Sequence, residues 1–167
     1  MFFRDQYWFL SNMYPCKIQI TFPPNKEIYT FNCVESAFQA CKCIERIHEF
    51  ESLDGFQAKK LGRKVALRSD WEQVKLLIMK SLVRIKFQQH PDLCQKLKEI
   101  SGPIVEENTW GDKYWGKCNG VGQNHLGAIL MEIRDNNWLK ASVPSGIGAF
   151  AWVINSFLKD TVLPHGS

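Results

Sequence analysis

The stretch DWEQVKLLIMKSLVRIKFQQH, residues 70–90, carries the clearest helical pattern in the chain and decides what the other elements pack against. Apolar side chains recur along it at the spacing of one helix face, at positions 74, 77, 78, 82 and 85. We expect Asp70 to cap the start of this helix with its side chain, and Pro91 follows the end of the pattern. We therefore predict a long helix with one face in the core.

Ahead of this helix, the sequence changes from strand periodicity to helix periodicity. The segments KIQITFPP (17–24) and EIYTFNC (27–33) alternate branched or aromatic residues with polar ones, and PPNK (23–26) between them has turn chemistry. These segments predict a hairpin. From Val34 onward, through Phe38, the apolar residues follow helical spacing.

Four further segments complete the predicted secondary structure. GFQAKKLGRKV (55–65) predicts a short helix that ends near Gly62, and PDLCQKLKEI (91–100) predicts another. HLGAILMEIRDNNWL (125–139) has helical spacing, and PIVE (103–106) predicts one brief strand. Helices thus outnumber strands. We predict an α+β fold, a predominantly helical single domain with a small antiparallel β-sheet.

Length and composition bound the class of protein. The chain has 167 residues, enough for one sizeable core, and a formal net charge of +4 with its basic residues spread along the sequence. Its six cysteines lack the spacing of a zinc site, and the only close pair is Cys41 and Cys43. The start of the chain does not resemble a cleavable signal. The simplest prediction is a reduced, cytoplasmic protein with buried free thiols.

The longest apolar stretch does not predict a membrane span. GIGAFAWVINSFL (146–158) is interrupted by polar residues and is too short to cross a bilayer. We expect it to form a terminal helix docked on the domain, and we expect no membrane partner.

The stretch CVESAFQACK (33–42) places three polar residues, Glu35, Gln39 and Lys42, on one face of a predicted helix. Charged helix faces usually meet water, so these residues can form an exposed stripe. The rest of the stretch is small or apolar, however, and a largely buried helix with one polar stripe more often lines a binding site. The sequence pattern leaves both interpretations open.

The segment TWGDKYWGKCNGVGQN (109–124) predicts a loop rich in aromatic residues and glycines. Asp112 lies in it between Trp110 and Trp115. Such an aspartate can bond its own backbone in a turn, or it can be a carboxylate held among indole rings that suit a flat base or a sugar. Spacing alone does not choose between these roles.

The end of the same loop, GVGQN (120–124), has only half of a phosphate-binding glycine pattern, because position 125 is His. Gly122 can still let the backbone approach a phosphate, and Asn124 can donate and accept hydrogen bonds. No histidine has a partner at metal-ligand spacing, so we expect neither a metal nor a cofactor.

Five motifs taken together resemble a known family. In chain order they are FLSNMYP (9–15), CVESAFQACK (33–42), LGRKVALRSDWEQVK (61–75), VEENTWGDKYWG (105–116) and GQNHLGAILMEIR (122–134). Their order is similar to that of the NADAR family, also called YbiA-like, over residues 2–135. The resemblance implies a YbiA-like domain in residues 1–141, followed by an extension of unknown role at residues 142–167.

The activity that this resemblance implies is N-glycosidic hydrolysis of a phosphorylated riboside. The main expectation is removal of ADP-ribose from guanine in DNA or RNA, with an ADP-ribosyltransferase toxin as the counterpart. One alternative is an N-glycosidase of early riboflavin-synthesis intermediates that releases ribose 5-phosphate. Another is a non-catalytic module that binds ADP-ribose or NAD.

The resemblance also implies the site residues. The family's glutamate, lysine, tryptophan and aspartate correspond to Glu35, Lys42, Trp71 and Asp112. Further substrate contacts are expected from Asn12, Trp110, Trp115, Gly122 and Asn124.

Roles for the site residues follow from the chemistry of a ribose–nitrogen bond, whose cleavage develops positive charge on the sugar. Asp112 is expected beside that charge and Glu35 in proton transfer, although the two roles can be reversed. Lys42 can bind a phosphate, polarise the ring oxygen or form a Schiff base with an opened ribose. The tryptophans are expected to stack on the base.

Overall fold

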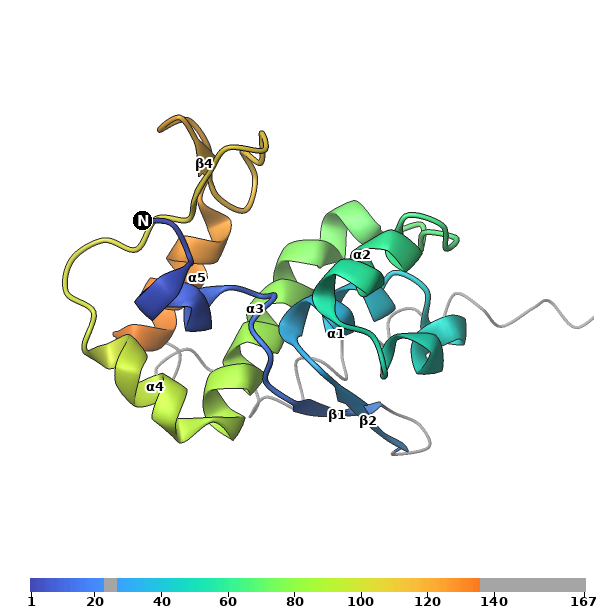
Figure 1. The fold of residues 1–167 in the computed structure, drawn as a ribbon. Helices are drawn as coiled ribbons and strands as arrows, with labels where there is room; N and C mark the ends of the chain where they lie inside the picture. Colours follow the sequence, from blue (N-terminus) through green and yellow to red (C-terminus); the bar gives the residue numbers. More distant parts are fainter. Residues whose placement is uncertain (23–26, 136–167) are drawn as a thin grey trace, which may run out of the picture.

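The computed structural model describes residues 1–22 and 27–135 of the chain (Figure 1). In chain order its elements are η1 (Asp5–Leu10), β1 (Ile18–Phe22), β2 (Glu27–Phe31), α1 (Val34–Ala40), η2 (Ile44–Phe50), α2 (Gly55–Gly62), α3 (Trp71–Gln89), α4 (Pro91–Lys98), β3 (Glu107–Asn108), β4 (Lys117–Cys118) and α5 (His125–Arg134). The two η elements are 3-10 helices. Helices dominate and the main sheet is small and antiparallel, which confirms the predicted α+β class.

Helix α3 packs against four other elements of the fold. Contacts with it come from α1, α4, α5 and β1, and Figure 1 shows it running through the middle of the fold. Three residues of the predicted stripe, Ile78, Leu82 and Ile85, are buried, while Val74 and Leu77 are half-buried against the same core. The predicted helix and its place in the core are therefore confirmed.

The start of α3 differs from the prediction in one detail. Asp70 lies at the N-cap position, but its side chain makes no capping hydrogen bond. Its carboxylate instead accepts two hydrogen bonds from Arg68, at 2.6 and 2.9 Å. A charge-assisted pair with a buried guanidinium competes successfully with a single backbone N–H. The side-chain cap predicted from the sequence is thus wrong.

The predicted hairpin is confirmed. Strand β1 pairs with β2 in antiparallel register, with Ile18 opposite Phe31 and Ile20 opposite Tyr29. These four side chains are buried, as alternation with polar neighbours predicts. The predicted PPNK turn lies outside the described residues.

Two local predictions need correction. Helix α1 ends at Ala40, because the next N–H groups, those of Lys42 and Cys43, bond carbonyls three residues back in turns. Lys42 therefore lies beyond the helix that carries Glu35. The strand predicted at residues 103–106 is also wrong, because β3 begins only at Glu107. The preceding segment bonds the side chain of Asn124 instead, and only the Glu106 carbonyl accepts from β4, from the Lys117 N–H.

The six cysteines are free in the structure, and four of them are buried, Cys16, Cys33, Cys41 and Cys43. Their free, mostly buried state agrees with the prediction. No helix in the described part of the chain is long and apolar enough to cross a membrane. The docked terminal helix that we expected at residues 146–158 lies outside the described residues.

Candidate active site

Glu35 and Gln39 are buried on α1, at 6% and 5% exposure. An exposed polar stripe is therefore excluded for these two residues. The Gln39 amide Nε2 donates a 2.8 Å hydrogen bond to Glu35 Oε1. The Glu35 backbone N–H donates to the carbonyl of Asn12 at 3.0 Å, so the N-terminal segment holds the start of the helix. Hydrogen bonds thus hold both the backbone and the side chain of Glu35.

Helix α2 approaches α1 closely because glycines face it. A Cβ atom at Gly62 would overlap the amide oxygen of Gln39, and one at Gly55 would lie 3.4 Å from Glu35 Cβ. Asp54 starts α2 with a capping box in which the side chain of Gln57 bonds back. The glycines let the helix backbone cover the polar pair and remove it from water.

Lys42 lies just past α1 and remains electrostatically coupled to Glu35. Its carbonyl accepts a 3.0 Å hydrogen bond from the Arg68 N–H. Burial lowers the pKa of Lys42, the charge of Glu35 raises it, and the charges of Lys59 and Arg63 lower it. The structure therefore brings Glu35 and Lys42 together, and it adds two cations that the sequence analysis did not single out, Lys59 in α2 and Arg63 directly after it.

Aromatic rings join α1, α3 and the loop. Trp71 is buried at 6% exposure, 4.9 Å from the ring of Phe38, and Lys42 Nζ lies 5.7 Å from the Trp71 ring centre. Trp115 meets the other side of this cluster with its ring 5.5 Å from Phe38, edge to face. Trp110 is 67% exposed and thus lies apart from these buried rings. The aromatic cluster places the loop next to α1.

Asp112 has the turn role that the sequence left open, because its Oδ1 accepts hydrogen bonds from the backbone N–H groups of Tyr114 and Trp115, both at 2.9 Å. Asn108 bonds the Asp112 backbone from both sides, accepting from its N–H at 3.0 Å and donating to its carbonyl at 2.7 Å. The carboxylate is half-buried and keeps its second oxygen outside these bonds. A structural role therefore does not exclude a chemical one.

Glu106 is the site residue that the sequence analysis missed. Its pKa is raised to about 7, first by burial and then by the charges of Asp112 and Glu35, while Lys59 lowers it. Glu106 is therefore within electrostatic range of the loop carboxylate and of α1. The signal that could have found it is its position in the motif VEENTWGD, six residues before Asp112.

The remaining expected contacts have structural partners. The Asn124 amide donates to the Ile104 carbonyl and accepts from the Glu106 N–H, both at 3.0 Å. Gly122 has a φ of 155°, and a Cβ there would overlap the carbonyl oxygen of Gly116. The Asn12 side chain points to Met79, with Nδ2 3.3 Å from its sulfur. These residues shape the site, and their contact with substrate stays a prediction.

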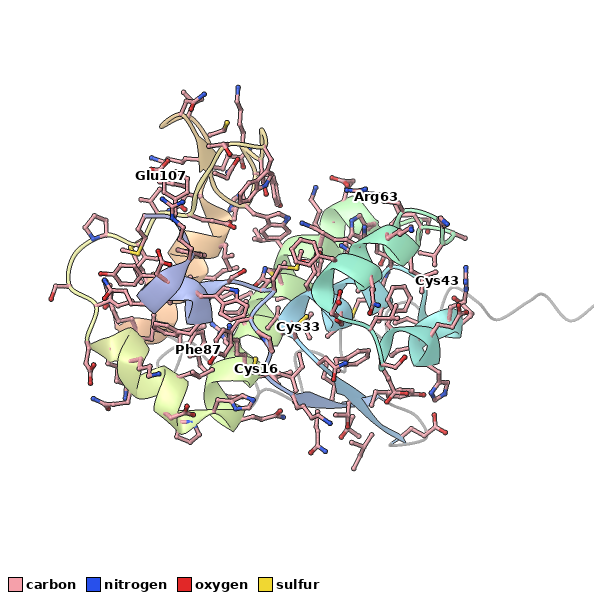
Figure 2. All side chains as sticks on the ribbon, in the orientation of Figure 1. Cys16, Cys33, Cys43, Arg63, Phe87 and Glu107 are labelled. Carbon is pink, nitrogen blue, oxygen red and sulfur yellow. The ribbon has the colours of Figure 1, made fainter. Side chains whose placement is uncertain are left out.

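The site brings together acids, cations and rings from distant parts of the chain. In Figure 2, Arg63, directly after α2, and Glu107, a β3 residue that is not part of the site, are both labelled in the upper part of the view. Within the described residues, no group of three or more His, Cys, Asp or Glu side chains could hold a metal ion.

Comparison with known proteins agrees with this arrangement. Residues 1–138 match the NADAR domain. The N-glycosidase YbiA of Shigella boydii is 34% identical over 139 residues, which cover 78% of this chain and 82% of that protein. A riboflavin biosynthesis protein of Vibrio vulnificus is 30% identical over 137 residues, covering 78% of this chain and 36% of that protein. The NMR structure of the Escherichia coli protein YbiA matches with a TM-score of 0.68 and 31% identity over 81% of each chain.

The fold, the carboxyl groups and these relatives together define a hydrolase that acts on N-glycosyl bonds. Such an enzyme needs acids beside a sugar, which is what α1 and the loop supply. The chain belongs to the NADAR family. The family and the hydrolase class predicted from the five motifs are thereby confirmed.

Proposed function

We propose that this enzyme removes ADP-ribose from guanine bases of nucleic acid by hydrolysing the bond between ribose and the guanine amino nitrogen. The observation that carries the proposal is the coupling of Glu35 on α1 to Lys42 on one side and to Glu106 on the other. A carboxylate stabilises the positive charge that develops on the sugar, and a neighbouring cation suits the phosphates next to it.

The cationic side of the site fits a substrate with more than one phosphate. Burial is the main cause that lowers the pKa of Lys42, and the charges of Lys59 and Arg63 lie close enough to Lys42 to lower it further. Like charges gathered in this way cost free energy in the free protein and are relieved when an anion binds. A diphosphate such as that of ADP-ribose supplies the matching charge, with phosphate binding as the main role of Lys42.

The aromatic side fits a base that belongs to a polymer. Trp71 and Trp115 border the buried ring of Phe38, while Trp110 is exposed two residues before Asp112. Stacking of a nucleobase on an aromatic side chain contributes about 1–3 kcal/mol. An exposed indole near the reactive carboxylate supports a nucleic-acid substrate, DNA or RNA, more than a small free metabolite.

A second candidate is hydrolysis of an early riboflavin-synthesis intermediate with release of ribose 5-phosphate. The similarity to the Vibrio vulnificus riboflavin biosynthesis protein favours it. This substrate also joins a phosphorylated ribose to an exocyclic amine of a heterocycle, so the same acids would serve. This substrate carries one phosphate and is not part of a polymer. It would therefore leave Trp110 and part of the cationic side without a contact.

The test is incubation of the protein with guanine-ADP-ribosylated DNA and RNA oligonucleotides and, separately, with the riboflavin intermediates. We expect release of ADP-ribose, and a loss of about 10²–10⁴-fold in kcat/KM for Glu35→Gln. The matched control is Glu99→Gln in an exposed position after α4. Release of ribose 5-phosphate alone would favour the second candidate, and binding of ADP-ribose without any hydrolysis would leave a non-catalytic module.

A further inference from the structure

Glu106 is a carboxyl group that the expected roles of Glu35 and Asp112 leave unused. Its Oε2 is shielded from solvent and has no hydrogen-bond partner within the described residues. An ionised carboxylate in that position would lose its hydration without compensation, whereas the neutral acid loses much less. The surroundings therefore favour a carboxylic acid that carries its proton.

The backbone of Glu106 is held from several directions. Its N–H donates to Asn124 Oδ1 at 3.0 Å, and its carbonyl accepts from the Lys117 N–H at 2.8 Å. Gly116 lies so close that a Cβ atom there would be 3.1 Å from Glu106 Cβ. Glu106 is thus bonded by the uncharged side-chain amide at the N-cap of α5 and by a backbone N–H of β4. An acid placed this firmly can be aimed at one atom of a substrate.

The loop around Glu106 also touches α1 directly. The Trp115 ring packs against Phe38, with 5.5 Å between ring centres, and Gly116 is the next residue in the loop. Phe38 lies three residues after Glu35 and hence on the same face of α1. The contact of Trp115 with Phe38 and that of Gly116 with Glu106 therefore link Glu106 to α1 by packing, independently of any titration argument.

The charged groups that act on Glu106 come from three parts of the fold, namely Asp112 in the loop, Glu35 on α1 and Lys59 on α2. Burial raises the pKa of Glu106 to about 7, the two carboxylates raise it and the ammonium lowers it. A general acid is most effective when its pKa lies near the working pH. Glu106 meets this condition without a metal ion.

We propose that Glu106 is the general acid of this site and gives its proton to the amine nitrogen as the ribose–nitrogen bond breaks. The inference rests on the proposed function and moves this proton transfer from Glu35 to Glu106. The anomeric carbon–nitrogen bond breaks, its electron pair stays on nitrogen, and the Glu106 proton completes the free amine. Water then bonds to the anomeric carbon beside Asp112 and loses a proton to Glu35. Exchange with solvent returns that proton to Glu106.

The experiment compares wild-type protein with Glu106→Gln and with the control Glu107→Gln, which changes the adjacent carboxylate in β3. On ADP-ribosylated oligonucleotides, wild-type kcat/KM is expected to fall as the pH rises above about 7, because the acid form disappears. The Glu106→Gln variant is expected to lose about 10²–10⁴-fold and to lack this fall. The Glu107→Gln variant is expected to keep both the rate and the pH profile of the wild type.

A second measurement needs no substrate. Carbon-13 NMR of protein labelled at the glutamate carboxyl carbons should show one resonance that titrates near pH 7, where an ordinary glutamate titrates near about 4.3. That resonance should be absent from Glu106→Gln and present in Glu107→Gln. If Glu106→Gln fails to fold, Glu106→Asp replaces it in the rate measurement, with a reduced rate and a retained fall at high pH.

Two outcomes overturn the inference while the proposed function stands. One is an active wild type with Glu106→Gln equally active and unchanged in pH profile, and the other is a Glu106 carboxyl that titrates in the ordinary range. Failure of the proposed function looks different, because the wild type then releases no ADP-ribose although the carboxyl that titrates near neutral pH is present.

Discussion

The helical half of the site and its loop half hold their carboxyl groups in different ways. In the helical half, α1 and α2 bury Glu35 between packed helices, with Gly55 and Gly62 allowing the close approach. In the loop half, residues 105–124, single polar side chains bond the backbone, as Asn108 does to residues 112 and 117. In the helical half, many packing contacts hold the position of the carboxyl group. In the loop half, a few hydrogen bonds hold it.

The largest effect is expected from Gly116→Ala, which breaks the loop half. The added Cβ would overlap the Glu106 carbonyl oxygen and lie 3.1 Å from the Asn108 amide nitrogen. Both neighbours are held in place, so the strain cannot relax cheaply, and we expect a loss of about 3 kcal/mol in the free energy of unfolding. Chemical denaturation measures it.

The control for this prediction is Gly120→Ala in the same loop. Its φ is +77°, but a Cβ there would meet nothing within 4 Å. The cost should be about 1 kcal/mol, for the backbone conformation alone. Equal losses for the two variants would show that the crowding at residue 116 is not what holds the loop.

A second prediction concerns Lys86 of α3, which holds the N-terminal segment that bonds the start of α1. Its Nζ donates to the carbonyls of Phe9 at 2.6 Å and Ser11 at 2.9 Å, next to the Asn12 carbonyl that accepts from Glu35. Burial lowers the pKa of Lys86 to about 8, whereas it is about 10.4 in an unfolded chain. Between these values the unfolded chain binds more protons, so the Lys86 contribution to the free energy of unfolding rises with pH.

The measurement compares the wild type with Lys86→Met by chemical denaturation at several pH values from 8 to 10.4. The wild type is expected to gain about 1–3 kcal/mol over this range relative to the variant. Subtracting the variant removes the contribution of Cys41, whose pKa burial raises and which therefore acts in the opposite direction. If the difference in the free energy of unfolding between the two proteins did not change with pH, the lowered pKa of Lys86 would be contradicted.

The smallest effect is expected from Gln39→Ala, which sharpens the comparison by removing one bond from the helical half. Glu35 would lose its side-chain partner at 2.8 Å but keep its backbone bond to Asn12. We expect about a tenfold fall in kcat/KM, equivalent to about 1.4 kcal/mol, with the helices still packed. Gln95→Ala, on the exposed side of α4, should leave the rate unchanged. If Gln39→Ala kept the kcat/KM of the wild type, helix packing alone would orient Glu35.

Sequence patterns predicted the regular elements well and the loop poorly. The helices, the hairpin and the central place of α3 follow from apolar periodicity, which survives into the fold because it specifies which face is buried. The side-chain cap at Asp70 and the strand at residues 103–106 were wrong for one physical reason. Arg68, two residues before Asp70, and Asn124, 18 residues after Glu106, offered those groups better hydrogen-bond partners.

The site was predicted in its parts but not in its geometry. Glu35, Lys42 and Trp71 converge as the family motifs imply, whereas Glu106 carried no sequence signal of its own beyond its place in a motif. Asp112 could be read as a turn residue or as a reactive acid, and the structure shows the turn role without removing its free oxygen.

By itself, then, the sequence determined the α+β class, the core helices and the membership of the NADAR family, because periodicity and motif order are properties of the chain. Tertiary structure alone decided that Glu106 has a carboxyl oxygen shielded from solvent with no hydrogen-bond partner among the described residues, and that Lys59 and Arg63 lie near Lys42. Those properties depend on distances between α1, α2 and the loop, and desolvation and Coulomb energies have no counterpart in any local pattern.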